Sequence, residues 1–166
     1  MKIFTLLFSF LFVFSSISQQ EVIDLFTKGD NAKIEKWLKK NPDGTIQTLQ
    51  PQIDLLISNG NYPSAPCFTE TMNIIEFSIL YKNTSLTGSL LKNPKIGGKT
   101  ANLTLGVSKA IIVNDLKLVK KLWKLGATLD QKCEFCHNRN NLQLAFGNHT
   151  DKEMVDFIIG HTTEED

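Results

Sequence analysis

The sequence predicts an all-α protein built from stacked helix-turn-helix units. Four segments can be aligned, and in each the apolar residues recur at three- and four-residue steps, the spacing that lines one face of a helix. Each segment also carries a polar pair at its expected turn: Gly29-Asp30, Asn83-Thr84, Asn114-Asp115 and Asn148-His149. One such unit is too small to bury its apolar face alone, so we expect successive units to stack into a common core.

The chain begins with a segment typical of a secretory signal peptide. Lys2 precedes an apolar stretch over residues 3–14, and small Ser16 and Ser18 stand where a signal peptidase cleaves. The stretch is about a dozen residues long, whereas a membrane-spanning helix needs about 20. We therefore expect residues 1–18 to be removed and residues 19–166 to form one exported domain. The bacterial periplasm fits best, and a secreted eukaryotic protein fits as well.

The charge balance of the exported domain is neutral. Removal of Lys2 reduces 18 basic residues to 17, against 17 acidic residues, and Arg139 is the only arginine. A neutral chain with one arginine offers no electrostatic argument for nucleic acid or for an anionic membrane. We expect a monomer that has no membrane anchor after cleavage and does not bind nucleic acid.

Each aligned segment is expected to form a short helix, a turn and a second helix. The steps between the segments are 53, 32 and 35 residues, and the segments begin at Leu25, Ser78, Ala110 and Ala145. Asp30 and Asp115 are helix-capping residue types placed ahead of second helices. Gly126 is expected to end one of these helices, because glycine accepts positive φ without steric cost.

Three further expectations concern the surfaces and connections of the units. The long first step leaves about twenty extra residues, which predict a helix over 53–57 and then an irregular loop. Trp37 and Trp123 occupy equivalent second-helix positions and are expected to pack in the core. A solvated outer face is expected at Lys117, Lys120, Lys121 and Lys124.

Residues 105–161 resemble ankyrin repeats. In "AIIVNDLKLVKKLWKLGATLD", the pair Asn114-Asp115 is similar to the family's turn between helices, and "GATLD" is similar to the segment that leads into its hairpin loop. "NNLQLAF" resembles the Thr-Pro-Leu-His-Leu-Ala opening, but Asn140-Asn141 replace Thr-Pro, which is expected to weaken the cap there. The resemblance implies an ankyrin-repeat solenoid of about four repeats with a period of roughly 33 residues, the first and second being degenerate.

Cys133, Cys136 and His137 have the C-x-x-C-H spacing by which haem is attached in c-type cytochromes. A haem would also need an apolar pocket and a second axial ligand such as Met154, His149 or His161. The apolar residues beside the motif are expected to belong to the repeat helices, which leaves the motif on an exposed hairpin tip.

Two other interpretations of these cysteines stay open. An oxidising compartment would allow a disulfide between Cys133 and Cys136. A zinc or copper site would use both cysteines and His137, with His149 or Cys67 as a fourth ligand. We expect the disulfide and no cofactor, and haem c or zinc is the alternative.

Enzyme motifs are not found. "NPKIGGKT", residues 93–100, resembles a phosphate-binding loop, but it lacks the first glycine and follows an expected helix instead of a strand. It is interpreted as a loop between repeats. Neither G-x-S-x-G nor H-E-x-x-H occurs, so no catalytic activity is predicted.

The family resemblance implies a scaffold that binds another protein through its hairpin tips and the concave face of its inner helices. Carried over to this chain, the tips are residues 95–100 and 131–138. Phe135 and Arg139 are the expected anchors, because aromatic and arginine side chains dominate binding energy at interfaces. The candidate protein-binding residues are Lys95, Lys99, Lys132, Phe135 and Arg139. The sequence does not identify the partner.

Overall fold

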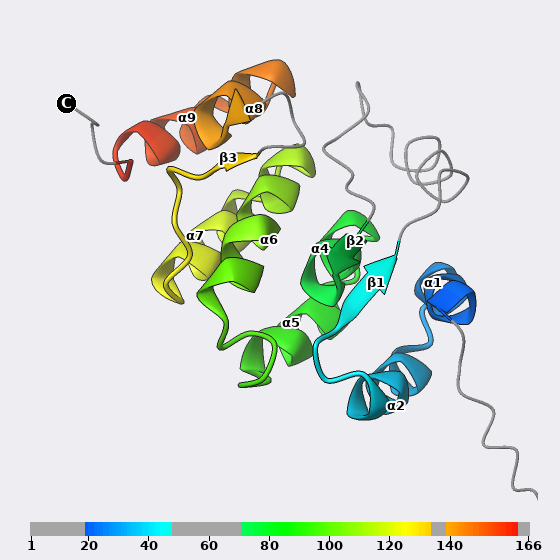
Figure 1. The fold of residues 1–166 in the computed structure, drawn as a ribbon. Helices are drawn as coiled ribbons and strands as arrows, with labels where there is room; N and C mark the ends of the chain where they lie inside the picture. Colours follow the sequence, from blue (N-terminus) through cyan, green and yellow to red (C-terminus); the bar gives the residue numbers. More distant parts are fainter. Residues whose placement is uncertain (1–18, 48–70, 134–138, 163–166) are drawn as a thin grey trace, which may run out of the picture.

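The structure is a computed structural model that describes residues 19–47, 71–133 and 139–162. Within these ranges the chain is mostly helical, as predicted, and its helices form four pairs that follow one another from the N-terminal to the C-terminal end (Figure 1). None of the described helices is long and apolar enough to cross a membrane. The pairs are α1 (Gln19–Lys28) with α2 (Asn31–Lys40), α4 (Ile74–Leu80) with α5 (Thr84–Lys92), α6 (Thr100–Ile112) with α7 (Leu116–Lys124), and α8 (Asn141–Gly147) with α9 (Lys152–Ile159). The signal peptide expected at 1–18 and the helix expected at 53–57 lie outside the described residues.

All four pairs are joined by the same turn. In each, a backbone N–H donates to the carbonyl oxygen five residues earlier, at 2.8 to 3.1 Å. The donors are Asp30, Asn83, Asp115 and Thr150, and the acceptors are Leu25, Ser78, Ala110 and Ala145. These acceptors are the first residues of the four segments aligned in the sequence. The residue before each donor has positive φ: Gly29, Lys82, Asn114 and His149. The sequence alignment therefore identified structurally equivalent positions in all four units.

Side chains at these turns start the second helices as predicted. The carboxylate of Asp30 accepts a hydrogen bond from the N–H of Lys33, and that of Asp115 accepts from the N–H of Leu118. Hydrogen bonds from Lys33 also lower the pKa of the Asp30 carboxyl below its ordinary value. Gly126 follows the end of α7 with a φ of 100°, so the predicted glycine stop is confirmed.

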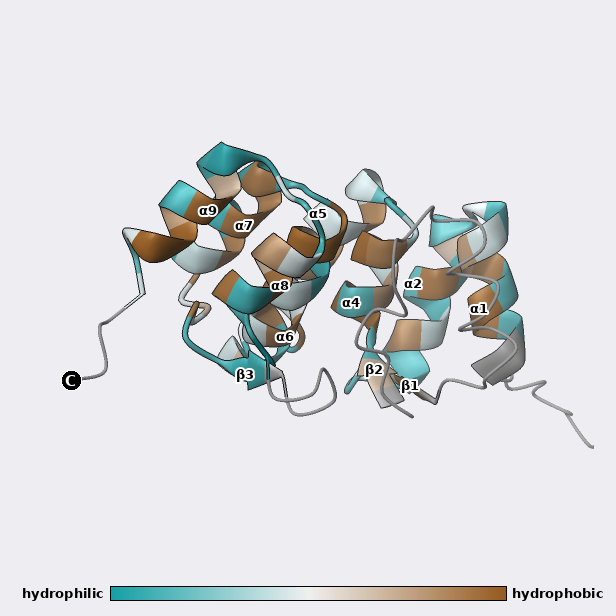
Figure 2. Cartoon of the chain, turned by 90° about the horizontal axis from the view of Figure 1, so that it is seen from above, coloured by the Kyte–Doolittle hydropathy of each residue, from teal (hydrophilic) through white to brown (hydrophobic). Residues whose placement is uncertain are grey.

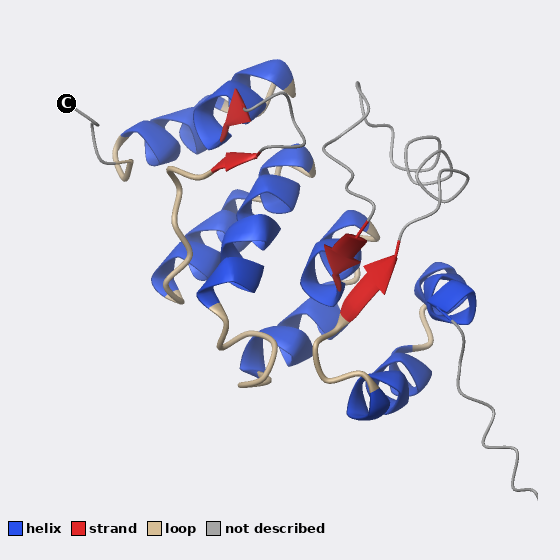
Figure 3. Cartoon of the chain, viewed as in Figure 1, coloured by secondary structure: helices blue, strands red, loops and turns tan. Residues whose placement is uncertain are grey.

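We call the first helix of each pair the inner helix. Two short β-hairpins precede inner helices, one before α4 and one before α8 (Figure 3). β3 (Lys132–Cys133) pairs with β4 (Arg139–Asn140), so two antiparallel strands flank the tip predicted at 131–138, and residues 134–138 of that tip lie outside the described residues. β1 (Thr45–Gln47) pairs with β2 (Thr71–Asn73), a hairpin that the sequence analysis did not predict. The tip predicted at 95–100 is different: residues 94–98 form turns without a strand, and buried Ile96 holds them to the core.

The core lies between the helix pairs. α6 packs against both α4 and α8, and Figure 2 shows hydrophobic residues on the faces where the helices meet. Trp37 is buried as expected, but the expectation for Trp123 was wrong, because 36% of Trp123 is exposed. Its neighbour Leu122 fills the core position, and the Trp123 ring instead meets the edge of Phe157 at 5.8 Å between centroids.

One ion pair is buried inside this core. Lys109 of α6 and Glu76 of α4 approach to 3.3 Å, and their side chains are 2% and 3% exposed. Glu76 also accepts a hydrogen bond from the N–H of Asn73 at 2.9 Å, and so completes a capping box at the start of α4. The same carboxylate thus joins the end of β2, the N-terminus of α4 and the neighbouring helix α6.

Replacing Lys109 with Met should lower the free energy of unfolding by about 3–5 kcal/mol, because the Glu76 carboxylate would remain buried without its cation. The double variant Lys109→Met with Glu76→Gln should recover part of that loss, since the neutral amide can still accept from Asn73. Urea denaturation followed by circular dichroism measures both. Lys124→Met, at an exposed position of α7, is the control and should change stability by less than about 0.5 kcal/mol. A Lys109→Met variant as stable as this control would contradict the role assigned to the pair.

Candidate protein-binding surface

The β3–β4 hairpin is fastened to α8 by its last residue. The side chain of Asn140 accepts from the N–H of Gln143 at 2.8 Å, and the Gln143 side chain accepts from the N–H of Asn140 at 3.0 Å. This capping box corrects the expectation that Asn140-Asn141 weaken the start of the repeat. Asparagine is among the best N-cap residues, and glutamine three positions later completes the reciprocal pair.

The side chain of Asn141 links the same hairpin to the neighbouring helices. Its side chain is fully buried, donates to the carbonyl of Leu129 at 2.9 Å and accepts from the Ser108 hydroxyl at 3.1 Å. These bonds satisfy a buried amide and tie α8 both to α6 and to the segment that leads into β3. The base of the hairpin is therefore fixed to α6 and α8 by hydrogen bonds.

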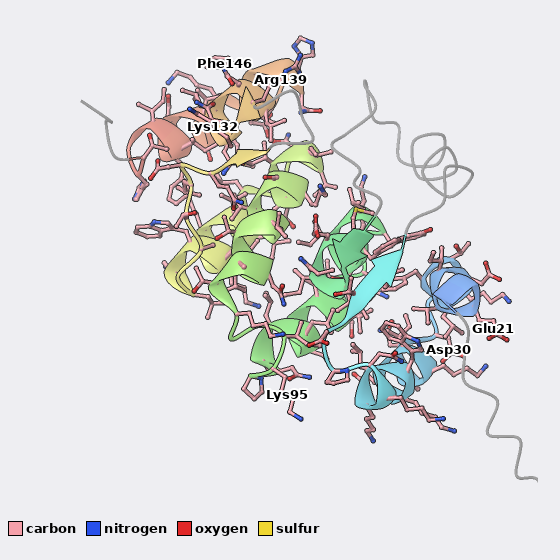
Figure 4. The ribbon with its side chains drawn as sticks, in the orientation of Figure 1. Glu21, Asp30, Lys95, Lys132, Arg139 and Phe146 are labelled. Carbon is pink, nitrogen blue, oxygen red and sulfur yellow. The ribbon has the colours of Figure 1, made fainter. Side chains whose placement is uncertain are left out.

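Lys132 and Arg139 stand on the two strands of this hairpin, and both are exposed. The Arg139 guanidinium lies against Gly147 in the last turn of α8: a Cβ atom at Gly147 would stand 3.2 Å from Nη1. Figure 4 shows both basic residues beside α8 and β3. Phe135, the other expected anchor, lies outside the described residues.

Phe146 on α8 adds an aromatic side chain that the sequence analysis did not select. It is 60% exposed, the most exposed of the large hydrophobic residues in the described chain. It occupies the position after the turn acceptor, where the other units have Phe26, Ile79 and Ile111, which are at most 4% exposed. No further inner helix among the described residues covers α8 at this position. Alignment of these four positions, together with the order of the units, could have identified Phe146 as exposed from the sequence.

We use the name hairpin surface for Lys132, Arg139 and Phe146. Figure 4 places all three around α8 and the hairpin. An exposed ring close to an arginine has the composition of a protein-binding surface, in which aromatic and arginine side chains carry most of the energy. Lys132 pairs with Asn140 and not with Arg139, so its side chain extends from the other face of the ladder.

The two other predicted lysines lie elsewhere. Lys95 is exposed in the turns between α5 and α6, and it lines a groove of about 480 Å³ between α2 and α5 together with Glu35 and Lys39. Lys99 is also exposed, and its ammonium nitrogen lies 3.4 Å from a carboxylate oxygen of Asp43. Figure 4 shows Lys95 well away from the hairpin surface. The structure therefore separates the four predicted residues that it describes into two groups: Lys95 with Lys99, and Lys132 with Arg139.

The cysteine motif lies mostly outside the described residues, which include Cys133 but not Cys136 or His137. The backbone of Cys133 pairs with Arg139 at the end of β3. Of the second axial ligands considered for haem, Met154 is fully buried in the core and His149 is exposed at a turn. His161 stacks on Phe157 at 4.2 Å between ring centroids. Within the described ranges no cluster of three His, Cys, Asp or Glu residues could hold a metal ion.

No protein-family model matches this chain, and no curated protein or solved structure matches it either.

The equivalence of Ile111 and Phe146 predicts very different costs for the same truncation. Ile111→Ala should lower the free energy of unfolding by about 2–5 kcal/mol, because it leaves a cavity where α8 packs on α6. Phe146→Ala should cost less than about 1 kcal/mol, because more than half of the ring is already in water. Urea denaturation of the two variants tests this difference. A loss at Phe146 equal to that at Ile111 would mean that the ring is covered in solution.

Proposed function

We propose that this chain is an exported ankyrin-repeat protein without catalytic activity that binds another protein. The observation that carries the proposal is the exposed Phe146 beside Arg139, on a hairpin that capping and buried hydrogen bonds hold in place. Hydrogen bonds that hold the backbone of these residues reduce the conformational entropy lost on binding, and aromatic and arginine side chains are enriched at the centre of protein interfaces. The partner remains to be identified.

Several features of the fold support the ankyrin part of the proposal. The four helix pairs share one turn, and their inner helices α4, α6 and α8 stack in order. Hairpins precede α4 and α8, and both helices begin with an asparagine capping box. The aligned segments of the last three units are 32 and 35 residues apart, close to the family's period of about 33.

The inner-helix face contributes to the proposed interaction unevenly. All seven residues of α4 are buried, so this helix presents no side chain to a partner. α6 exposes Leu105 near its middle, and α8 exposes Phe146. We therefore assign binding mainly to the hairpin surface and to the exposed positions of α6 and α8.

Capture of a partner should depend on Phe146 and Arg139. The tagged mature chain, mixed with the extracytoplasmic fraction of its own source, should retain a protein that is lost with Phe146→Ser and with Arg139→Ala. Mass spectrometry of the retained fraction, with label-free quantitation, gives the readout. Leu125→Ser removes another exposed apolar side chain, outside the hairpin surface, and serves as the control. Retention that is the same for all variants would contradict the assignment of the hairpin surface.

Haem or metal binding at the C-x-x-C-H motif is the second candidate function. β3 ends at the first cysteine of this motif, and β4 begins two residues after its histidine. Intact mass and an absorption spectrum of the mature chain from its native compartment separate the possibilities. We expect a mass two hydrogen atoms below that of the reduced chain and no visible band, which would support a disulfide. A haem-sized mass increase with a Soret band would replace the protein-binding proposal by a cytochrome.

A further inference from the structure

A groove on the outer side of the molecule runs between α5 and α7. It has a volume of about 850 Å³ and lies on the side of the second helices, away from the hairpins. α5 lines it with Thr84, Thr87 and Gly88, and α7 lines it with Lys117, Lys120 and Lys121. Both sets have the spacing i, i+3, i+4, so each forms one face of its helix, and the two faces border the same groove.

The lining of the groove is mainly apolar, and its buried hydroxyl groups are hydrogen-bonded. Val113, which follows α6, and Leu116 and Leu118 of α7 are partly exposed and contribute apolar surface, with buried Ile79 beneath them. The buried hydroxyl of Thr87 donates to the Ser78 hydroxyl at 2.8 Å. A Cβ atom added at Gly88 would meet no atom within 4 Å, which shows that α5 leaves open space at this point. A partner side chain or backbone can therefore approach α5 closely.

The charges around the groove are mainly positive. Lys82 joins the three lysines of α7, and the acidic lining residues are Asp115 and Glu153. The Asp115 carboxylate already caps α7 through the N–H of Leu118. Within the described part of the chain, Lys82, Lys117 and Lys121 form no ion pair with a carboxylate. Their positive field is therefore available to an anionic ligand.

From these observations we propose that the α5–α7 groove binds an acidic amphipathic segment of a protein partner, with its apolar side chains on the groove floor and its carboxylates against Lys82, Lys117 and Lys121. Helices that dock in grooves use this division between an apolar face and a charged rim. The apolar floor favours a peptide over a nucleic acid, which would present phosphates and ribose to it. This inference rests on the proposed protein-binding function and adds a second surface, separate from the hairpin surface.

Gly88 provides a direct steric test. In Gly88→Leu the new Cβ atom meets no other atom within 4 Å, and leucine forms helices more readily than glycine, so the variant should be at least as stable as the original chain. Gly88→Ala is the matched control, because its single methyl group leaves most of the groove open.

Two charge variants complete the set. Lys117→Glu with Lys121→Glu reverses the rim, whereas Lys36→Glu with Lys92→Glu makes the same change in net charge at exposed lysines that do not line the groove. Phe146→Ser separates this site from the hairpin surface.

The probe is a labelled helical peptide of about 15 residues with Glu on one face and Leu on the other, and fluorescence anisotropy measures its binding to the mature chain. We expect saturable binding that weakens at least about tenfold with Gly88→Leu and with the reversed rim, and changes less than about twofold with the controls. Unchanged binding by Phe146→Ser would show that this site does not depend on the hairpin surface.

Three results would overturn the inference. They are an absence of saturable peptide binding, binding that Gly88→Leu leaves intact, and preferential binding of a single-stranded oligonucleotide with the same dependence on Gly88 and the rim lysines. The last result would assign the groove to a polyanion. None of these results bears on capture through Phe146 and Arg139, so the two proposals can fail separately.

Discussion

The buried pair of Lys109 and Glu76 constrains how the second and third helix pairs stack. Lys109 stands immediately before the turn acceptor of its unit, where the neighbouring units have Phe77 and Leu144, both buried. A lysine in such a position can be accommodated only with an anion beside it, since burial of an unpaired charge costs several kcal/mol. Glu76 supplies that anion while it caps α4. Slippage of α6 along α4 would separate the two charges, so the pair disfavours other registers between the two units.

The register has consequences at both outer surfaces. α6 carries α7 on one side and the packing site of α8 on the other. The spacing of α5 and α7, which creates the lysine-rimmed groove, depends on how α4 and α6 stack beneath them. The buried hydrogen bond between Ser108 and Asn141 then positions α8, and with it the β3–β4 hairpin, relative to α6. Lys109 and Ser108 are adjacent in sequence, so one short segment of α6 positions the groove and supports the hairpin surface.

Local patterns made the turns and helices predictable, whereas exposure depended on long-range packing. The turn residues, the capping aspartates and the stop at Gly126 act over five residues or fewer, and the structure agrees with them. The β1–β2 hairpin was missed because its strands are only three residues long and lie far apart in the chain. Trp123 was wrongly predicted to be buried and Phe146 was not selected as exposed, both for a related reason. Their burial is decided by which neighbouring unit covers them, and an amphipathic pattern within one helix does not contain that information. Of the candidate binding residues, exposure of the lysines and Arg139 followed from their charge, but the division into two groups followed from the stacking.

The inner face of a stack of helix pairs is open to a partner only where the inner helices leave side chains exposed. In this chain α4 leaves none, because every one of its residues is buried, and Glu76 is committed to the ion pair. Because α4 is fully buried, the second unit contributes no side chain to the inner-helix surface that the family resemblance implied for binding. Exposed features suited to recognition are found instead at the hairpin beside α8 and between the second helices α5 and α7. These surfaces differ in chemistry, since one offers an aromatic ring with arginine and the other an apolar groove with lysines. Two surfaces of this kind, held in one register by α6, would let the chain engage two segments of a single partner at a fixed separation, and the second contact would then form at the high effective concentration set by the first.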